Sequence, residues 1–278
     1  MQTFVAPAGH SLQYDVAGAG SPVLLIMGFA TPSSAWGHQI AGLRDHHQVI
    51  WFDNRGIAGS GAPDGPWQMA DFAADALALL DHLGVARAHV VGQSMGGMIA
   101  QHVALRTPER LLSLSLLATH AGGKRARTPP FAAWPYLVGR ALPSARVRLL
   151  SIANLLFPLK VLNKGYLQSV TPELQRDYGP RQPLATLRRQ LVAMRGHDVE
   201  TKLAGLAQLP TLIARPDLDI LIGPDQSDRL KMALPHARLI AFPQAGHGAI
   251  RQCAAQMNEA LLAHFAAADA QVNKQASP

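Results

Sequence analysis

The sequence predicts an α/β fold in which a mostly parallel sheet carries helices on both faces. Short apolar runs alternate with segments of helical periodicity along most of the 278 residues, and this alternation is typical of parallel sheets. Apolar residues make up 48% of the chain and charged residues only 15%, so the protein can bury a large core. The alternation stops between residues 122 and 206, which predicts a helical insert.

The first part of the chain supplies six expected strands. Apolar residues recur at helical spacing between them, at residues 36–43, 69–83 and 95–106, and these segments are expected to be helices. The wholly apolar runs are typical of strands that are buried on both faces. The expected strands are residues 4–6, 12–16, 22–27, 48–52, 88–92 and 112–118.

The second part begins with the insert, where prolines such as Pro129-Pro130 and Pro172 divide the chain into short helices and turns. Strands are expected again at residues 210–215 and 237–242, with a final amphipathic helix at residues 251–267. We therefore predict four segments. They are a first core part at residues 1–121, the insert at residues 122–206, a second core part at residues 207–268, and a frayed polar tail at residues 269–278.

A G-x-S-x-G motif, Gly92-Gln93-Ser94-Met95-Gly96, lies between an expected strand and an expected helix. In that context the motif predicts a nucleophile elbow, a sharp turn that holds a serine hydroxyl at the carboxyl edge of the sheet. The serine backbone is strained there, and only small residues two positions away on either side leave it room. Ser94 is therefore the predicted nucleophile.

A serine hydroxyl needs a general base within hydrogen-bond reach. His247 lies in the sequence Gly246-His247-Gly248, after the last expected strand and before the last expected helix. In elbow-containing enzymes the chain order is serine, acid, histidine, so this loop is where the base belongs. The other eleven histidines lack that context. His247 is the predicted base.

The base needs a carboxylate that fixes its tautomer. The loop after the seventh expected strand offers Asp219, our choice, and Asp217 as the alternative. The loop after the sixth strand holds Thr119-His120-Ala121 and no carboxylate, which favours Asp219. The oxyanion of the reaction needs two backbone N–H donors, and we expect them from Met95 and from Phe29.

These stretches together resemble the α/β-hydrolase superfamily, in its esterase, lactonase and cofactor-free haloperoxidase-like branch, over nearly the whole chain. The resemblance implies that the insert after the sixth strand is a cap that roofs the active site, and that Asp53 and Arg55 are structural. Met27 stands where many members have histidine, as in polyketide methylesterase-like members, and Pro216 stands where the acid loop usually begins with glycine. Ser94 in place of aspartate excludes haloalkane dehalogenases and epoxide hydrolases.

We predict a serine hydrolase that cleaves a small-to-medium carboxylic ester or lactone through an acyl-enzyme. Two alternatives stay open: hydrolysis of a carbon–carbon bond in a diketone-type substrate, and a ligand-binding regulator or receptor with a slow or vestigial triad. No cofactor is expected, and no metal, because the sequence has no His-Glu-x-x-His or Cys-x-x-Cys cluster. The expected partner is a small molecule. Nucleic acid is not expected, because basic residues are not interleaved with aromatic ones. The oligomeric state stays open.

The charge of the chain is concentrated in the insert. Thirteen lysines and arginines lie between Gly122 and Arg195, against two acids, Glu173 and Asp177. They could attract anionic substrates or a membrane surface, or simply be solvated, which we favour. No apolar run is long enough for stable membrane insertion. The chain start lacks a secretory pattern, and the single cysteine, Cys253, fits a reducing compartment, so we expect a cytoplasmic protein.

Overall fold

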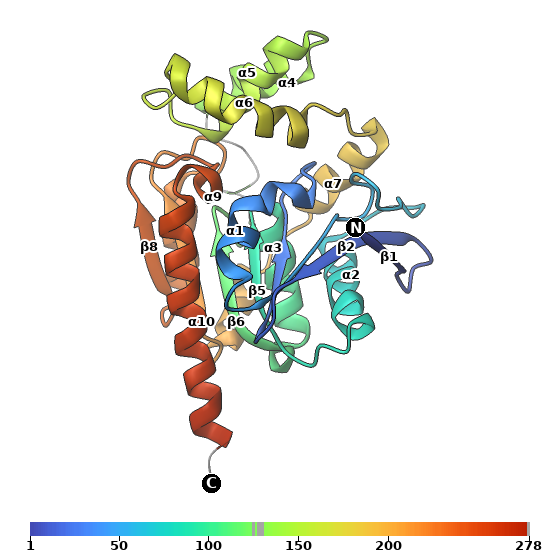
Figure 1. Cartoon of the computed structure of the whole chain (residues 1–278), viewed down its shortest axis with the longest axis vertical. Helices are drawn as coiled ribbons and strands as arrows, with labels where there is room; N and C mark the ends of the chain where they lie inside the picture. The colour runs from blue at the N-terminus through green and yellow to red at the C-terminus, as the bar shows by residue number, and fades with distance from the viewer. Residues whose placement is uncertain (124–125, 127–130, 277–278) are drawn as a thin grey trace.

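A computed structural model describes residues 1–123, 126 and 131–276, and they form an eight-stranded sheet with helices on both faces (Figure 1). The strand order is β1-β2-β4-β3-β5-β6-β7-β8. β2 is antiparallel to both of its neighbours, and all other pairs are parallel. The α/β prediction is confirmed. The strands are β1 (Gln2–Val5), β2 (Ser11–Ala17), β3 (Pro22–Ile26), β4 (Gln48–Phe52), β5 (Ala88–Gln93), β6 (Leu111–Leu117), β7 (Thr211–Pro216) and β8 (Arg238–Phe242).

Side chains of the central strands alternate between two apolar layers, as the pleat of a strand requires. In β3, Leu24 and Ile26 belong to one layer, and Val23 and Leu25 to the other. Because both faces are covered by helices, the central strands are apolar throughout. The helices on the first face are α2 (Met69–His82), α3 (Met95–Arg106) and α8 (Pro224–Ala233). Those on the second face are α1 (Gly37–Leu43), α9 (Ala249–Gln252) and α10 (Ala254–Ala276).

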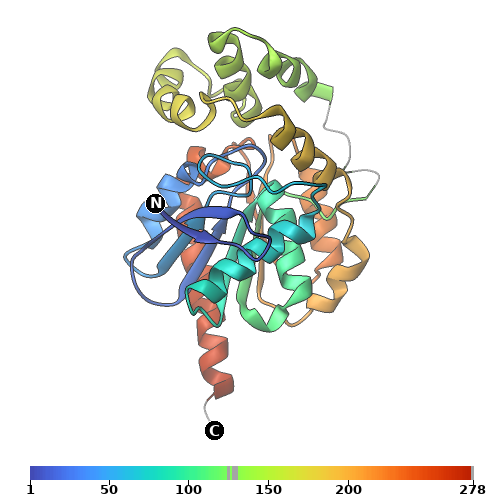
Figure 2. The ribbon, with the colours of Figure 1, turned by 90° about the vertical axis from the view of Figure 1, so that its right-hand side faces the viewer.

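Between β6 and β7 the chain forms helices that lie over one edge of the sheet as a separate layer (Figure 2). Pro172 lies inside α6 rather than at a helix end, contrary to our expectation. The expected turn at Pro129-Pro130 and the basic residues Lys124, Arg125 and Arg127 lie outside the described residues. The helices of this layer are α4 (Trp134–Ala141), α5 (Ala145–Leu156), α6 (Lys164–Tyr178) and α7 (Leu184–Arg195), with 3-10 turns η4 (Phe131–Ala133) and η5 (Glu200–Leu206).

The helical layer has its own small core, and its two ends are joined to each other. Residues of α5 and α6 form an apolar cluster of their own, which includes Ile152 and Leu174. Where the chain enters and leaves the layer, Gly122 pairs with Asp198 in an antiparallel bridge. Val199 N–H also donates to the Ala121 carbonyl at 2.9 Å. The layer is therefore fastened at the point where it meets the sheet.

The C-terminal helix differs from our prediction of a helix over residues 251–267 and a frayed tail at residues 269–278. The helix breaks at Cys253, and α10 then continues to Ala276. Asp269 is held within this helix, because its Oδ2 accepts a hydrogen bond from Ser21 Oγ at 2.8 Å and its Oδ1 lies 3.1 Å from His89 Nε2. Asp269, the first residue of the expected tail, is thus attached to Ser21 and to the start of β5, whereas the last turns of α10 extend beyond the sheet (Figure 1). Residues 277–278 lie outside the described part. No helix among the described residues has both the length and the apolar content that a membrane crossing requires.

Candidate active site

Ser94 occupies the turn between β5 and α3 with a backbone φ of 55° and ψ of −121°. This left-handed conformation is strained for a residue with a side chain. A Cβ at Gly92 would overlap the Gly96 carbonyl, and a Cβ at Gly96 would overlap the Ile26 carbonyl. The turn is also held from β6, since Thr119 Oγ1 donates to the Ser94 carbonyl at 2.7 Å. The local geometry is that of a nucleophile elbow.

His247 lies in the loop between β8 and α9, and its Nδ1 is 2.7 Å from Asp219 Oδ2. A carboxylate only accepts, so this contact places the proton of a neutral ring on Nδ1 and leaves Nε2 as an acceptor. The Asp219 side chain is fully buried. Its Oδ1 accepts the N–H groups of Leu221 and Ile222 at 2.8 and 2.9 Å. The carboxylate is thereby fixed behind the ring.

Asp217, the alternative acid, points to a different partner. Its Oδ1 accepts a hydrogen bond from Arg215 Nε at 2.8 Å, and Arg215 also binds Asp228. The structure therefore brings Asp219 to His247 and Asp217 to Arg215. The two aspartates are only two residues apart, so this choice depends on the path of the loop after β7.

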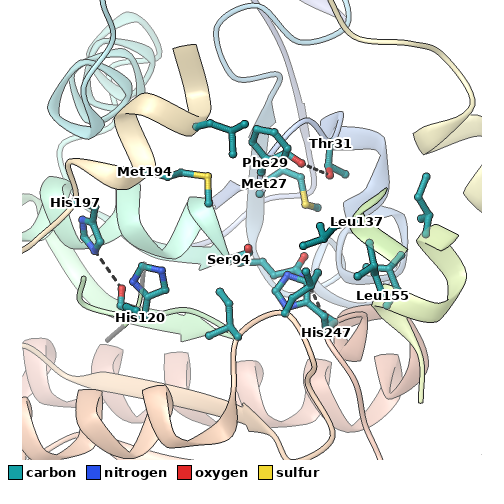
Figure 3. A pocket seen from close by; sticks show the side chains of 18 of the residues that line it. Met27, Phe29, Thr31, Ser94, His120, Leu137, Leu155, Met194, His197 and His247 are labelled. Atoms are coloured by element: carbon teal, nitrogen blue, oxygen red, sulfur yellow. Dashed lines mark hydrogen bonds between the residues drawn. The ribbon is translucent and has the colours of Figure 1, made fainter. Parts of the chain in front are cut away.

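Ser94 and His247 line the same cavity, where their side chains lie close to each other (Figure 3). The structure records no hydrogen bond between Ser94 Oγ and the His247 ring among these described residues. Contacts of this kind often tighten only when substrate binds. Gln93, which sequence reasoning passed over, donates from Nε2 to the His247 carbonyl at 2.9 Å. The residue before the nucleophile thus positions the histidine loop.

The loop after β3 forms another part of the cavity wall. Phe29 lines the cavity, and its carbonyl accepts a hydrogen bond from Thr31 Oγ1 at 2.9 Å. Asn54, a second residue that sequence reasoning missed, holds the start of the loop by donating to the Met27 carbonyl at 2.8 Å. Met95 is the first residue of α3, where backbone N–H groups have no partner within the helix. Helix N-termini favour negative charge.

Asp53 and Arg55 lie behind the cavity and do not line it. Asp53 Oδ1 accepts both the backbone N–H and the Oγ–H of Ser33, at 2.7 and 2.8 Å. Burial raises the pKa of Asp53, and the hydrogen bonds from Ser33 oppose that shift. Arg55 forms a buried ion pair with Asp75 at 2.7 Å. Both residues therefore bind neighbouring segments of the core together.

The cavity has a volume of about 480 Å³ and lies between the edge of the sheet and the helical layer. Its lining is mostly apolar, including Leu155 and Leu156 of α5 and Leu191 of α7. Among the described lining residues, two histidines were not expected at the site, His120 and His197. Burial lowers the pKa of His120 to about 4 and that of His197 to about 3, so both rings are neutral at pH 7.

One group of described side chains has the spacing of metal ligands, His47, His89 and Asp269. It was not foreseen, because its members come from three distant segments. His89 stands at the start of β5 and Ser94 follows the end of that strand, so the group lies at the opposite edge of the sheet, about 15 Å away. Ser21 Oγ already contacts both His47 Nδ1 and Asp269 Oδ2. This group takes no part in the site around Ser94.

Comparison with known proteins gives consistent relatives. A family model described as alpha/beta hydrolase fold matches residues 21–146. The chain is 31% identical over 255 residues to a protein named as a carbamate hydrolase, RutD of Variovorax paradoxus, covering 90% of this chain and 94% of that protein. It is 32% identical over 276 residues to a protein named as a non-heme bromoperoxidase, BpoC of Mycobacterium tuberculosis, covering 94% and 99%.

Solved structures agree in fold. A hydrolase from Pseudomonas aeruginosa superposes with a TM-score of 0.81 at 25% identity, covering 95% of this chain and 97% of that one. An enol-lactonase from Burkholderia xenovorans superposes with a TM-score of 0.80 at 22% identity, covering 95% and 100%. The chain therefore belongs to the α/β-hydrolase superfamily. The family model and the relative named as a carbamate hydrolase indicate hydrolysis as the class of reaction.

Proposed function

We propose that this protein is a serine hydrolase that cleaves a small-to-medium carboxylic ester or lactone through an acyl-enzyme. The observation that carries the proposal is the joint placement of Ser94, in its strained elbow, and the His247–Asp219 pair on one cavity. A nucleophile, a base and an orienting acid are the three groups that acyl transfer needs. The single cysteine, Cys253, favours a cytoplasmic location.

In the proposed reaction Ser94 Oγ attacks the substrate carbonyl carbon while its proton passes to His247 Nε2. The C–O bond to the leaving alcohol then breaks, and His247 returns the proton to that alcohol. Water then attacks the acyl-enzyme while its proton passes to His247, and His247 returns that proton to Ser94 Oγ as the acid is released. Asp219 keeps the Nδ1–H tautomer in place and stabilises the imidazolium that forms.

The tetrahedral intermediate needs donors at its oxyanion, and we assign this role to the N–H groups of Phe29 and Met95. Phe29 lies in the loop after β3, and Met95 begins α3 directly after the nucleophile. The contacts at Asn54 and Thr119 support both positions by holding the two loops. Donors fixed before the reaction are worth more than mobile water, because they need no reorganisation.

We also propose that residues 122–206 form a cap domain on a core made of residues 1–121 and 207–268. Its helices supply many of the apolar residues that line the cavity, so it would exclude water and select the acyl chain. The proposed partner is a small ester or lactone. Carbamates belong with these candidates because a carbamate carbonyl is attacked in the same way, and RutD is named for that reaction.

The test is turnover of p-nitrophenyl esters of rising chain length, with lactones, carbamates and a vinylogous diketone alongside. Wild type is expected to turn over an ester many times per chain. Ser94→Ala should reduce kcat by roughly 10⁴–10⁶-fold without a change in thermal stability. A fluorophosphonate probe should label Ser94 alone. Ser169→Ala, at an exposed serine on α6, is the matched control.

Each outcome separates the alternatives. Labelling of another residue, or an active Ser94→Ala variant, would show that the nucleophile is assigned wrongly. A single equivalent of released p-nitrophenol per chain would favour a receptor or regulator. Turnover of the diketone without ester turnover would favour carbon–carbon bond hydrolysis.

A further inference from the structure

The cavity wall on the far side of Ser94 from His247 contains a polar group that the proposed reaction does not use. His120 follows β6 and His197 follows α7, and both line the cavity (Figure 3). Each is more than nine-tenths buried, with relative exposures of 8% and 1%. The residues around them are chiefly apolar, such as Met194 and Ile222. A buried polar group in such surroundings needs a partner.

The tautomer of His120 follows from its backbone neighbour. Gly122 N–H donates to His120 Nδ1 at 3.0 Å. An amide nitrogen can only donate, so Nδ1 is an acceptor and the hydrogen of the neutral ring is on Nε2. Burial, with the nearby Arg229 cation, lowers the pKa of His120 to about 4. Among the described residues none is hydrogen-bonded to Nε2. The ring therefore offers one N–H donor to the cavity.

The ring of His120 cannot easily turn away, because its loop is fixed from two sides. Gly122 has a φ of +93°, and a Cβ there would overlap the His197 carbonyl, so the turn requires glycine. The His120 carbonyl accepts hydrogen bonds from Gln101 Nε2 at 3.0 Å and from His197 Nε2 at 3.1 Å.

His197 is fixed in turn. The Nε2–H of His197 donates to the His120 carbonyl, so Nδ1 of the neutral ring is an acceptor. This Nδ1 lies 3.2 Å from His102 Nε2, which donates to it. Three segments of the chain thus fix the orientation of the donor. A donor held in this way is a preorganised feature of a binding site.

The position of His247 indicates which part of the substrate, the acyl chain or the leaving alcohol, lies beside this donor. His247 must return a proton to the leaving alcohol, so the leaving group lies on the His247 side of Ser94. Figure 3 places His120 on the other side of Ser94. The wall at His120 therefore faces the acyl chain. A neutral imidazole brings no positive charge of its own, so its Nε2–H can pair with an oxygen acceptor that is itself uncharged.

We propose that His120 is a substrate-binding residue whose Nε2–H selects an acyl chain that carries a neutral oxygen acceptor, such as a ketone or amide carbonyl. The proposal rests on the ester or lactone hydrolase function proposed above and names the substrate class of that site. An acyl chain with an ammonium group at the same place is rejected, because two donors would meet.

The test compares p-nitrophenyl heptanoate with its 4-oxo, 5-oxo and 6-oxo analogues, in which a ketone replaces one methylene. For each analogue the ratio of kcat/KM to that of heptanoate is measured in wild type and in His120→Phe, so that intrinsic reactivity cancels between the two proteins. At one position of the ketone the wild-type ratio should exceed the variant ratio by roughly 3- to 10-fold, the value of one hydrogen bond. The change is expected mainly in KM.

His120→Gln is the rescue variant, because its amide can donate where Nε2–H stood, and it should recover part of the ratio. His46→Gln, at an exposed histidine, is the control. Equal ratios in wild type and His120→Phe at all three ketone positions would overturn the proposal, as would a ketone advantage that His120→Gln fails to recover in part.

Failure of the proposed function gives a different result. In that case heptanoate itself shows no turnover that depends on Ser94, in any variant. A wild-type enzyme that hydrolyses heptanoate but shows the same ratios as His120→Phe contradicts the His120 proposal alone. If His120→Phe does not fold, the same comparison is made with His120→Gln and His120→Ala.

Discussion

The cavity has two walls that are held in different ways. The sheet-edge wall consists of residues 27–31, Ser94 and His247, and it is fixed by glycine-dependent turns and hydrogen bonds from Gln93, Asn54 and Thr119. The helical wall consists of the lining residues of α4, α5, α6 and α7, which are mainly apolar. Directional contacts place atoms accurately, whereas apolar packing tolerates exchange of side chains of similar volume. The first wall therefore suits chemistry and the second suits selection.

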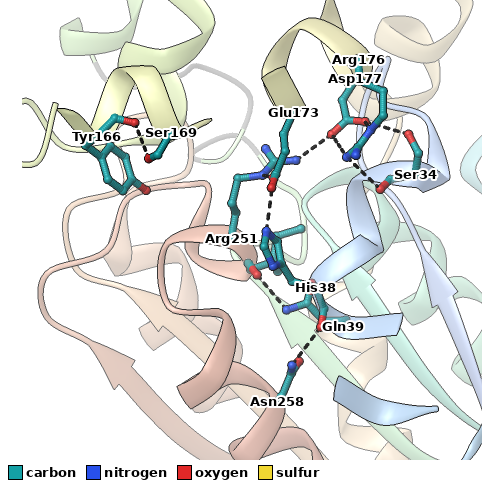
Figure 4. A network of polar contacts seen from close by, with 11 residues as sticks. Ser34, His38, Gln39, Tyr166, Ser169, Glu173, Arg176, Asp177, Arg251 and Asn258 are labelled. Carbon is teal, nitrogen blue, oxygen red and sulfur yellow. Dashed lines mark hydrogen bonds and ion pairs between the residues drawn. The ribbon is translucent and has the colours of Figure 1, made fainter. Parts of the chain in front are cut away.

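A small number of polar contacts join the two walls. Arg251, which precedes α10, binds Glu173 and Asp177 of α6, and Asp177 also accepts a hydrogen bond from Ser34 (Figure 4). Gln190 of α7 accepts the Ala30 N–H at 3.0 Å. These contacts connect the helical wall to the loops that carry the reacting groups. Substitutions at these contacts test whether stability and kcat change together or separately.

The largest effect is expected in the sheet-edge wall. Asp219→Asn should lower kcat by roughly 10³–10⁴-fold, because the amide no longer fixes the Nδ1–H tautomer of His247. Asp217→Asn is the matched control and should change kcat little, since Asp217 binds Arg215. Steady-state kinetics on one ester give kcat for both variants and for wild type. If the control lost more activity than Asp219→Asn, the acid would be the other aspartate.

A smaller effect is expected where the walls are joined. Arg251 has a side chain only 7% exposed, and Asp177 is fully buried. Arg251→Met should lower the free energy of unfolding by about 3 kcal/mol, because it removes the buried cation that Glu173 and Asp177 share and leaves the buried Asp177 with only the half-exposed Arg176. Arg176 also binds Asp177, but its side chain is 52% exposed, so Arg176→Met should cost less than about 1 kcal/mol. Urea unfolding measures both.

Equal losses in these two variants would mean that burial does not govern the junction between the walls. A kcat that fell together with stability in Arg251→Met would also break the comparison, because the two walls would then act as one unit.

Acidification is expected to act through the buried histidines on the helical side of the site. The pKa of His197 is lowered from 6.5 to about 3 by burial. Below pH 6.5 the His197 ring therefore binds a proton in the unfolded chain but stays neutral in the native protein. The contribution of His197 to the free energy of unfolding is fully present above pH 6.5. It is lost as the pH falls from 6.5 toward the pKa of the folded protein, by at most about 1.4 kcal/mol per histidine and pH unit.

Urea unfolding of wild type and His197→Asn at pH 7 and pH 5 measures this effect. The variant should lose less stability between the two values than wild type does. His46→Gln should behave like wild type, because His46 is exposed. An unchanged pH dependence in His197→Asn would mean that His197 is protonated in the folded protein.

The smallest effect concerns charge on the helical layer. Arg146 and Arg148 of α5 do not line the cavity, whereas Arg195 at the end of α7 does. Arg148 instead donates to carbonyls at Leu142 and Pro143. If the layer steers substrates, an anionic ester should gain a few-fold in kcat/KM over its neutral isostere at 0.01 M salt, where the Debye length is about 30 Å.

That advantage should shrink at 0.15 M salt, where the Debye length is about 8 Å. Arg195→Gln should remove more of it than Arg146→Gln. A rate ratio that does not depend on salt would mean that these arginines are simply solvated, and the helical wall would then select by shape and by hydrogen bonding alone.

The sequence by itself determined the parts of this protein that depend on short stretches of backbone. The alternation of apolar runs gave the sheet, since burial on both faces permits little else. The elbow was readable because a side chain at position 92 would overlap the Gly96 carbonyl, a steric rule that acts within five residues. The need for glycine at position 96 has a tertiary origin, because a Cβ there would overlap the Ile26 carbonyl of β3. The same local reasoning located His247 between the last strand and the last helix.

Tertiary structure decided whatever depends on distant segments meeting. The assignment of Asp219 rather than Asp217 to His247 follows from the path of a loop packed against β8. The attachment of Asp269 to Ser21 joins residues that are 248 positions apart in the chain, and no local pattern signals that contact. The donor at His120 requires Gly122, Gln101 and His197 to converge from separate segments. Propensity and spacing act over a few residues, whereas burial and hydrogen-bond partners are set by the whole fold.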